Sequence, residues 1–558
     1  MSMKPLRALT TGAAIAVLCA LSGGMAATAA TISPAATKSS PVRVAVILPF
    51  TVPNDSGAFI SAEALERYTA PDGFLTSRLD EAAGSTVTLA IDPMIIASIR
   101  VLGTSAPASA VDWLNRLALL TNDTFALAWA DSDLTAPLQA GATSVLEPTS
   151  LDYAIDANLF AAAPDEAPTP DPTADPEVGG VPALPTTESL LAWDYRLSDV
   201  AWPVANSVIA DDVATIAESG FTTTLLESTN LTRSSKANAV ATVDESTAVV
   251  IDSELSTGLR AASDATTPEA WLDAISGLED GLESVPTASA GSVVLSFDRE
   301  TLGSNARLGE TVVTLENNPS IEVVPLSTIA DDSAGRGKLI DSPQNTGRIR
   351  GTRSLLAAEE RDDRFATVAE NPSLITGERR LDLLTTLAPA PNRHPGGFGA
   401  SVTDYVADSR ALEQSVRLVK SSEILLLADR SSIYVSVAND LDQPVTVYVS
   451  IRALSPLLRV EDSRVEITIE PDSQKKAQVP VQSVSNGRVS LEVGLTSVTN
   501  DDIGTPTLVR INVQAGWEGP VTWVLGALVV IIFAAGIYRN LILRRRPVQP
   551  SPELPRGE

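Results

Sequence analysis

Cysteine and histidine are nearly absent from this 558-residue chain, which contains one of each. Cys19 lies in the apolar N-terminal segment, and His394 lies in a stretch rich in Pro and Gly. Beyond that N-terminal segment the chain therefore cannot build disulfides, cysteine nucleophiles or cysteine metal sites. A zinc-dependent hydrolase or deacetylase, and a Ser-His-Asp triad, need imidazoles that the sequence does not supply before residue 394.

Basic residues are also scarce, because 40 Lys and Arg face 69 Asp and Glu, for a formal charge of −29. Such a surface repels phosphate backbones, so we expect no nucleic-acid partner. Neither a G-x-x-x-x-G-K nor a G-x-G-x-x-G motif follows a predicted strand, so no nucleotide cofactor is expected, and we predict no other cofactor and no metal. With 44% apolar and 20% charged residues, the chain is predicted to fold into several domains.

Residues 1–30 have the order of a secretory signal peptide. Lys4 and Arg7 precede an apolar run from Ala13 to Leu21, and small residues end in Ala27-Thr28-Ala29. This order predicts cleavage near Ala30 or Thr31, and hence export.

A second apolar run, residues 521–538, contains 18 residues without a charge. This length suits one transmembrane helix, with Trp517 and Trp523 at one interface and Tyr538 at the other. The basic run Arg544-Arg545-Arg546 follows, and the positive-inside rule places the tail 539–558 in the cytoplasm. The predicted localisation is therefore the cell membrane, crossed once, with the N-terminal bulk outside.

Residues 42–330 alternate extended apolar segments with helical ones. Helical patterns fall at 59–83, 108–120, 211–219 and 268–282. The predicted strands lie at 42–50, 86–92, 124–131, within 190–204, and at 222–228, 248–253, 292–298 and 321–327. Eight strands alternating with helices predict a (β/α) barrel, with a doubly wound open sheet as the alternative.

One segment, 161–185, interrupts this pattern because it is acidic and rich in Pro. It is predicted to be a solvated loop, with a flexible cover or a partner-binding arm as alternatives.

Residues 351–420 are predicted to form a small helical connector. From 424 to 515, six or seven short segments alternate apolar and polar residues between Asn-Asp, Glu-Pro-Asp and Asn-Gly turns. This pattern predicts an immunoglobulin-like β-sandwich just outside the membrane.

Carboxylates follow many of the predicted barrel strands, at the end where barrel enzymes keep their working residues. These residues are Asp92, Asp131, Asp133, either Asp194 or Asp199, Glu227, Asp252, Glu254, Asp298 and Glu300. A glycoside hydrolase needs two such groups, and the candidates for that pair are Asp92, Asp194, Glu227 and Asp298. The alternative is that each carboxylate caps a helix or lies in a solvated turn, as Ser132-Asp133 before a helix-forming segment suggests.

Several stretches carry a resemblance to a known family. They are TVTLAIDPMII, FALAWADSDLTAPLQAGA and VAWPVANSVIADDVATIAESGFTTTLL, with the signal peptide, the sandwich and a single span followed by Arg. Together they resemble an uncharacterised family of exported, single-pass actinobacterial membrane proteins encoded beside the lipid II flippase. The barrel is distantly similar to those of polysaccharide deacetylases and glycoside hydrolases. It departs from the deacetylase pattern, because no paired Asp-Asp follows the first strand and the sequence has no H-x-x-x-H motif.

The resemblance implies a membrane-anchored protein of the cell envelope that assists peptidoglycan assembly, and the missing histidine, cysteine and paired motifs lead us to expect that it is non-catalytic. Its implied partners are the lipid II flippase or another envelope-assembly protein, or a glycan. The competing hypothesis is a carboxylate-dependent glycoside hydrolase acting on an envelope glycan, and the third is a purely structural spacer.

Overall fold

A computed structural model describes residues 40–53, 57–160, 184–234, 237–286, 291–299, 306–389, 396–419, 424–514 and 518–543. The predicted signal peptide, residues 161–183 of the Pro-rich segment, His394 and the Arg544-Arg545-Arg546 run lie outside the described residues. The chain divides into two units, Met1–Ser40 and Pro41–Glu558, and the architecture below is that of the second.

Seven parallel strands form the core of the N-terminal domain. They are β1 (Val42–Phe50), β2 (Thr88–Ile91), β3 (Thr124–Ala126), β4 (Val200–Ala201), β5 (Thr223–Glu227), β8 (Ser246–Ile251) and β9 (Ser292–Ser296). Their pairings run β4-β5-β8-β9-β1-β2-β3. A parallel bridge from Phe125 to Leu197, just before β4, joins the two ends of this order. The strands therefore close into a (β/α) barrel, as predicted.

The side chains of the strands alternate between two cores, as period-two geometry requires. Along β1, Val44, Val46 and Leu48 pack in the cluster shared with the surrounding helices. Ala45 and Ile47 point the other way, into a cluster with Ala90, Phe125, Val200, Leu225, Val249 and Val294 from the other strands. The barrel interior is thus filled by side chains and is not a channel.

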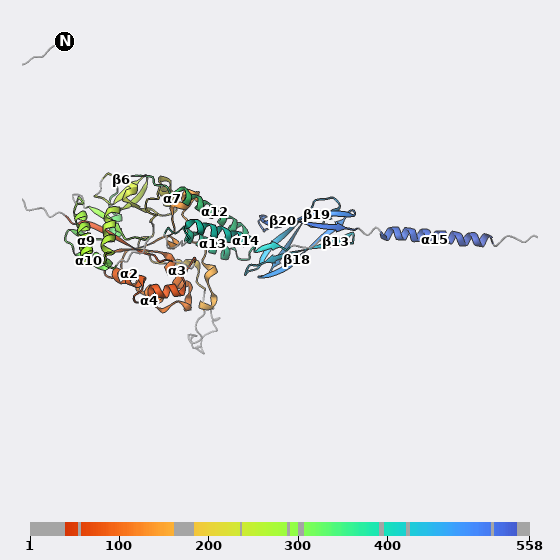
Figure 1. The fold of residues 1–558 in the computed structure, drawn as a ribbon, viewed down its shortest axis with the longest axis horizontal. Coiled ribbons are helices and arrows are strands. Elements are labelled where there is room, and N and C mark those ends of the chain that lie inside the picture. The colour runs from red at the N-terminus through yellow and green to blue at the C-terminus, as the bar shows by residue number, and fades with distance from the viewer. Residues whose placement is uncertain are drawn as a thin grey trace, which may run out of the picture. The chain divides into compact units, whose positions relative to one another are not determined.

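Helices surround these strands (Figure 1), with α2 and α4 below them, α7 above and α9 and α10 to the left in that view. They are α1 (Ala62–Thr69), α2 (Phe74–Ala82), α3 (Pro93–Val101), α4 (Ala108–Ala118), α5 (Thr135–Ala140), α6 (Thr187–Leu191), α7 (Ala210–Glu218), α8 (Ser253–Ser263), α9 (Pro268–Glu283), α10 (Leu308–Asn317) and α11 (Leu326–Ala330). The four predicted helical patterns correspond to α1 with α2, α4, α7 and α9. No helical pattern was predicted for α3, α5, α6, α8, α10 or α11. In α3 the nine residues PMIIASIRV are apolar on most faces and so show no helical period.

All eight predicted strand segments contain a strand, but the eighth differs from the expected arrangement. β10 (Ile321–Val323) pairs only with the first residues of β1, and the chain then turns into α11. Three strands were not predicted: β6 (Leu231–Arg233), β7 (Val240–Val243) and β11 (Gly335–Leu339). They extend the sheet beyond β8 through antiparallel and parallel pairs.

The segment after the barrel contains three helices, α12 (Thr346–Ala366), α13 (Pro372–Leu387) and α14 (Phe398–Glu413). A buried ion pair between Arg379 of α13 and Asp362 of α12, 2.8 Å long, holds the helices together. Asp362 also accepts a hydrogen bond from Ser409 of α14, and Arg379 donates to the carbonyl of Tyr405 at 2.9 Å. All three helices thus converge on one polar network inside their interface.

The C-terminal sandwich has two sheets. One has the order β12 (Val416–Leu418), β14 (Arg430–Asn439), β18 (Ser473–Ser483), β16 (Leu458–Val460). The other has the order β13 (Ile424–Leu426), β20 (Asp502–Val513), β19 (Gly487–Thr496), β15 (Val445–Ala453), β17 (Arg464–Ile469). Inward residues of both sheets share one core, which also contains Phe365 and Val368 from the end of α12. This is the predicted immunoglobulin-like sandwich.

The last described element is α15 (Glu518–Leu543). Its residues Val521–Leu543 make it the one helix in the described part of the chain that is long and apolar enough to cross a membrane. The predicted span, 521–538, lies within it.

Candidate functional site

The centre of the barrel mouth, at the carboxyl ends of the strands, is occupied by three side chains that we call the Arg299 cluster: Arg299, Asp131 and Trp202. Arg299 follows β9 and pairs with Asp131, which follows β3, at 2.9 Å. Its guanidinium also donates to the carbonyls of Trp202 at 2.7 Å and Pro203 at 2.5 Å, and lies 4.6 Å from the centroid of the Trp202 ring. The side chains of Arg299 and Asp131 are 7% and 3% exposed.

The Arg299 cluster rests on the barrel interior. The ring of Trp202 lies 6.2 Å from that of Phe125, whose side chain belongs to the interior core. A barrel enzyme binds the reacting part of its substrate in this position. Here a neutralised ion pair stacked on an indole fills it.

Asp92 directly follows β2 and is fully buried. Its Oδ1 accepts hydrogen bonds from the backbone N–H of Met94 and of Ala130, both at 3.0 Å. The first bond caps α3, and the second holds the turn after β3, where Ala130 has a φ of 56°. Asp92 thus joins two adjacent strand ends, and Pro93 fits the first turn of α3 because its missing N–H would have no partner there.

We expect Asp92→Ala to lower the free energy of unfolding by about 2 to 4 kcal/mol, because two buried N–H groups lose their acceptor. Asp92→Asn keeps one carbonyl oxygen and should lose less than half of that. Urea unfolding followed by tryptophan fluorescence measures both. Equal losses for Ala and Asn would contradict a capping role.

Glu227 ends β5, and its Oε2 accepts a hydrogen bond from Ser253 Oγ at 2.6 Å. Burial raises the pKa of Glu227 above its usual value, although Ser253, Arg260 and Arg299 act in the opposite direction. Glu227 therefore lies within electrostatic range of the Arg299 cluster. A carboxyl group with a raised pKa is the kind of group that can act as a general acid.

Because the pKa of Glu227 is raised, the direction in which its contribution to stability changes with pH can be predicted. The folded state holds the proton of Glu227 more tightly than the unfolded state does. The favourable contribution of Glu227 to the free energy of unfolding is therefore complete when the pH is below the pKa of the group in the unfolded state. It is lost as the pH rises through the folded pKa. We expect Glu227→Gln to stabilise the protein relative to wild type at neutral pH and to have little effect at pH 4. Urea midpoints across that range test this, and a pH-independent difference would contradict it.

The other two predicted catalytic residues lie elsewhere. Asp194 is exposed and lines a hollow of about 340 Å³ with Thr124, the first residue of β3, so it lies at the amino end of the strands, opposite Asp92. Asp298 follows β9 and acts electrostatically on Arg78 of α2, whose pKa burial lowers to about 10. Arg78 stacks on Phe74 and donates to the carbonyl of Pro49. The structure thus associates Glu227 with the Arg299 cluster, Asp92 with the adjacent turn, and Asp194 with neither.

Other rim carboxylates have structural roles. Asp252 accepts a hydrogen bond from the N–H of Leu255 at 3.1 Å and caps α8, with Glu254 in the first turn of that helix. Asp199 precedes β4 and so lies at the amino ends, where it accepts from Thr222. Glu300 is outside the described residues. Among the described residues, no three His, Cys, Asp or Glu side chains are grouped so that they could hold a metal ion.

Asp133 links the barrel mouth to the helices that follow the barrel. Its Oδ1 accepts from the N–H groups of Thr135 and Ala136 at 3.0 and 3.1 Å, as the capping alternative predicted. Its Oδ2 accepts from Gln344 at 2.7 Å and pairs with Arg348 of α12 at 3.3 Å. Both oxygens of the Asp133 carboxylate thus have partners, and Oδ2 holds α12 against the loop after β3.

A cavity of about 290 Å³ lies beside the Arg299 cluster, near the place where Phe125 of β3 is bridged to Leu197, just before β4. Its lining is largely apolar, with four aromatic side chains, Trp129, Tyr195, Trp202 and Phe221, and a single charged residue, Glu147. Burial raises the pKa of Tyr195 above its usual value. Aromatic walls with few polar groups suit the face of a sugar ring or another small ligand.

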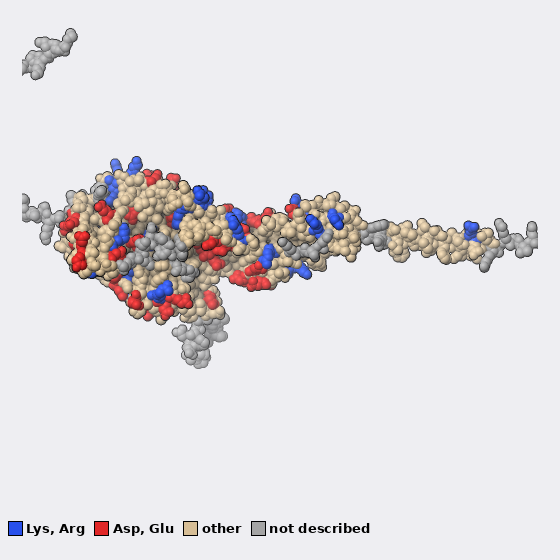
Figure 2. Space-filling view, in the orientation of Figure 1, with Lys and Arg blue, Asp and Glu red and all other residues tan. Residues whose placement is uncertain are grey.

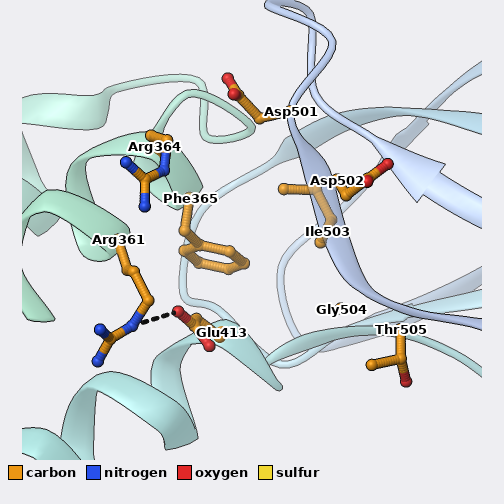
Figure 3. A pocket seen from close by; sticks show the side chains of 9 residues that line it. All are labelled: Arg361, Arg364, Phe365, Glu413, Asp501, Asp502, Ile503, Gly504 and Thr505. Atoms are coloured by element: carbon orange, nitrogen blue, oxygen red, sulfur yellow. Dashed lines mark ion pairs between the residues drawn. The ribbon is translucent and has the colours of Figure 1, made fainter.

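A second hollow, of about 330 Å³, lies where α12 and α14 meet the first residues of β20. Figure 3 shows its lining, with Arg361 and Arg364 on the helical side and Asp501 and Asp502 on the strand side. Arg361 pairs with Glu413 at 3.2 Å. Both signs of charge line this hollow, so it offers no strong preference for an anion or a cation.

The surface charge of the barrel domain agrees with its acidic composition. Figure 2 shows Asp and Glu side chains spread over the visible face of this domain, with Lys and Arg side chains between them. No strongly basic face is visible there. The surface of α15 is almost free of charge in the same view.

Asp131 was predicted from the sequence as a rim carboxylate, but Arg299 and Trp202 were not predicted to lie near it. The two charged residues are 168 positions apart, and only the barrel's closure brings them together. The available signals were the Trp-Pro pair after β4 and a basic residue directly after Asp298, which follows β9.

Fold and site together define a class: a (β/α) barrel with a plugged mouth, three helices, an immunoglobulin-like sandwich and one apolar helix. The chain belongs to the family described as "Family of unknown function (DUF6049)", whose model matches residues 22–550. No curated protein matches the sequence.

Three solved structures show the degree of structural likeness. The 4-alpha-glucanotransferase from Thermococcus litoralis is 11% identical, with 82% of this chain and 87% of that chain covered and a TM-score of 0.40. The alpha-2-macroglobulin of E. coli is 17% identical over 18% of this chain and 7% of its own length, with a TM-score of 0.16. SSP-19, an MSP-domain-like protein of Caenorhabditis elegans, is 12% identical over 17% of this chain and 94% of its own, with a TM-score of 0.14. Likenesses at this level do not define an activity.

Proposed function

We propose that this protein is a non-catalytic, membrane-anchored extracytoplasmic protein of the cell envelope that binds a partner in peptidoglycan assembly. The observation that carries the proposal is the Arg299 cluster. A glycosidase needs an open mouth in which two carboxylates face the scissile bond. In this barrel Arg299 neutralises Asp131 at the centre of the mouth, while Asp92, Asp133 and Asp252 hold backbone N–H groups.

The proposed anchor is α15, with the bulk of the chain outside the cytoplasm. Val521–Leu543 is long enough to cross the hydrocarbon core, and Arg539 begins the basic end that continues in Arg544-Arg545-Arg546. Basic residues favour the cytoplasmic side of a span, and the N-terminal segment has the order of a signal peptide.

The partner class comes from the resemblance to exported actinobacterial proteins encoded beside the lipid II flippase. We propose that flippase, or another envelope-assembly protein, as the partner, and an envelope glycan as the alternative ligand of the aromatic cavity. Crosslinking the full-length protein in its native host, followed by affinity capture and mass spectrometry, tests the partner. Recovery of envelope-assembly proteins is expected, and their absence at full crosslinking yield would overturn the proposal.

The second candidate, a carboxylate-dependent glycoside hydrolase, is favoured by one observation, the raised pKa of Glu227 at a strand end. Incubation of the purified full-length protein with peptidoglycan and other envelope glycans tests this directly. Release of reducing ends that disappears in Glu227→Gln would establish the hydrolase and overturn the non-catalytic proposal.

A further inference from the structure

One end of the sandwich carries four large apolar side chains that are exposed to solvent in the second unit. They are Leu425, Leu427, Leu454 and Val484, with exposed fractions of 54%, 65%, 52% and 64%. Single exposed apolar residues are common, but four on neighbouring loops and strand ends form a patch that marks an interaction surface. We call these four residues the apolar rim.

Hydrogen bonds show that the rim belongs to one end of the sandwich. The N–H of Ser483 donates to the carbonyl of Asp429 at 2.8 Å, which places the loop containing Val484 beside Leu427. The N–H of Val484 donates to the carbonyl of Leu457 at 2.9 Å, which adds the loop containing Leu454.

This is also the end from which the chain leaves the sandwich. β13 pairs with the last residues of β20, with Leu426 opposite Val513, and the N–H of Gln514 donates to the carbonyl of Leu426 at 2.8 Å. On the other side of β20, Val513 is opposite Gly487. Leu425 and Leu427 are the chain neighbours of Leu426, which pairs with Val513, so both lie beside the end of β20.

The link from this end to the apolar helix is short. Three residues, 515–517, separate Gln514 from Glu518, the first residue of α15. Four Cα–Cα steps span at most about 14 Å, whatever conformation they adopt. If α15 crosses a membrane, its entry point at Val521 holds the rim close to the outer headgroups, within reach of loop side chains.

The charged residues at this end of the sandwich suit contact with a lipid surface better than the charged residues on the rest of the chain do. Arg430, Arg459 and Arg488 are exposed there, against the acidic Asp429 and Glu461. These five residues carry a net charge of +1, with Arg430 paired with Glu461 at 3.7 Å, whereas the whole chain carries −29. Apolar side chains with nearby cations are the combination that binds the interface of a bilayer containing anionic lipids.

We propose that the apolar rim docks on the outer surface of the membrane, with Leu425, Leu427, Leu454 and Val484 in the headgroup layer. The rim then acts as a second contact that fixes the orientation of the sandwich on the bilayer, so that α15 is not its only attachment. The inference rests on the proposed membrane anchor and adds a lipid-binding surface to it.

Site-specific labels test the docking in the full-length protein. Because Cys19 is the only cysteine, a Cys19→Ser background leaves no thiol. The single variants Leu427→Cys and Val484→Cys are labelled at the new thiol with an environment-sensitive fluorophore. Each labelled protein is then placed in vesicles of phosphatidylcholine and phosphatidylglycerol, with or without lipids that have a nitroxide at the headgroup. The matched control is Val498→Cys, which is 53% exposed. It lies in the turn after β19, at the opposite end from Gly487 and about 30 Å away at strand spacing.

We expect nitroxide lipids to quench the labels at 427 and 484 several-fold more strongly than the label at 498. Equal quenching at all three positions, in protein that floats with the vesicles, would overturn the docking and leave the anchor intact. Failure of the protein to float would overturn the anchor and the docking together. Shielding of the rim labels in native membranes but not in pure lipid vesicles would assign the rim to a protein partner or a second copy and also overturn the proposal.

Discussion

Replacing Arg299 with methionine is expected to lower the free energy of unfolding of the barrel by about 3 to 5 kcal/mol. The substitution keeps an apolar stem over Trp202 but removes the ion pair between Arg299 and the buried carboxylate of Asp131. It also removes the donors to the carbonyls of Trp202 and Pro203. An unpaired buried charge is much more costly than the loss of a well-packed pair, so the double variant Arg299→Met, Asp131→Asn should recover part of the loss.

The matched control is Arg116→Met, because Arg116 pairs with Asp80 on the surface, with side chains 46% and 55% exposed. Exposed pairs contribute about 0 to 1 kcal/mol, so this variant should unfold almost as wild type does. Urea unfolding followed by tryptophan fluorescence compares the three variants. A loss below about 1 kcal/mol for Arg299→Met would show that the cluster does not stabilise the mouth.

The second large effect concerns the apolar helix. The double variant Val529→Arg, Ile532→Arg places two charges on one face at the middle of Val521–Leu543. Each central Arg costs about 2.5 to 3.5 kcal/mol on insertion, so the variant should lose most of its membrane retention. Ile542→Arg, near the end of the helix, is the control because its side chain can reach the interface.

Fractionation of host cells into membrane and soluble material measures this retention. We expect the double variant to move largely into the soluble fraction or the medium, while Ile542→Arg stays with the membrane. Retention of the double variant at the wild-type level would mean that α15 is not the anchor.

Parts of the fold with strong local signals could be predicted from sequence. The segments that became β14, β15, β18 and β19 alternate apolar and polar residues because one face of each strand meets the sandwich core. The barrel strand β1 is apolar on both faces because one face meets helices and the other the barrel interior.

Other elements depended on contacts that sequence does not show. The predicted strand 124–131 ends at Ala126, because the chain turns at Trp129–Asp131, where Asp92 Oδ1 binds the N–H of Ala130. That contact joins residues 38 positions apart. β6, β7 and β11 are short strands whose partners are set by tertiary packing rather than by a period of their own.

The site shows the same division. Placing carboxylates at strand ends followed from the strand pattern, and so did the alternative that they cap helices, which Asp92, Asp133 and Asp252 do. Which carboxylates lie near one another depends on which end of each strand they occupy. Asp194 and Asp199 precede β4 rather than follow it. The sequence pattern placed a strand only somewhere within 190–204, so it could not decide at which end of that strand these two carboxylates lie.

The plugged mouth and the apolar helix lead to one account of the protein. The barrel fold is retained while its mouth is filled by the Arg299 cluster, and Asp133 fastens the loop after β3 to α12. The end of α12 in turn contributes Phe365 and Val368 to the sandwich core. In this account the barrel is a surface for a partner, presented outside the membrane, and the carboxylates at its mouth perform no bond cleavage.

Complementation by the double variant Glu227→Gln, Asp298→Asn tests this central claim most directly. In a deletion strain of the native host, the measurement is the rate at which labelled peptidoglycan precursor enters the cell wall. The account predicts that the variant restores this rate to the same level as the wild-type chain, because neither carboxylate performs chemistry. Failure of the variant to restore it, while folded protein is present in the membrane at wild-type amounts, would contradict the account and favour a carboxylate-dependent enzyme.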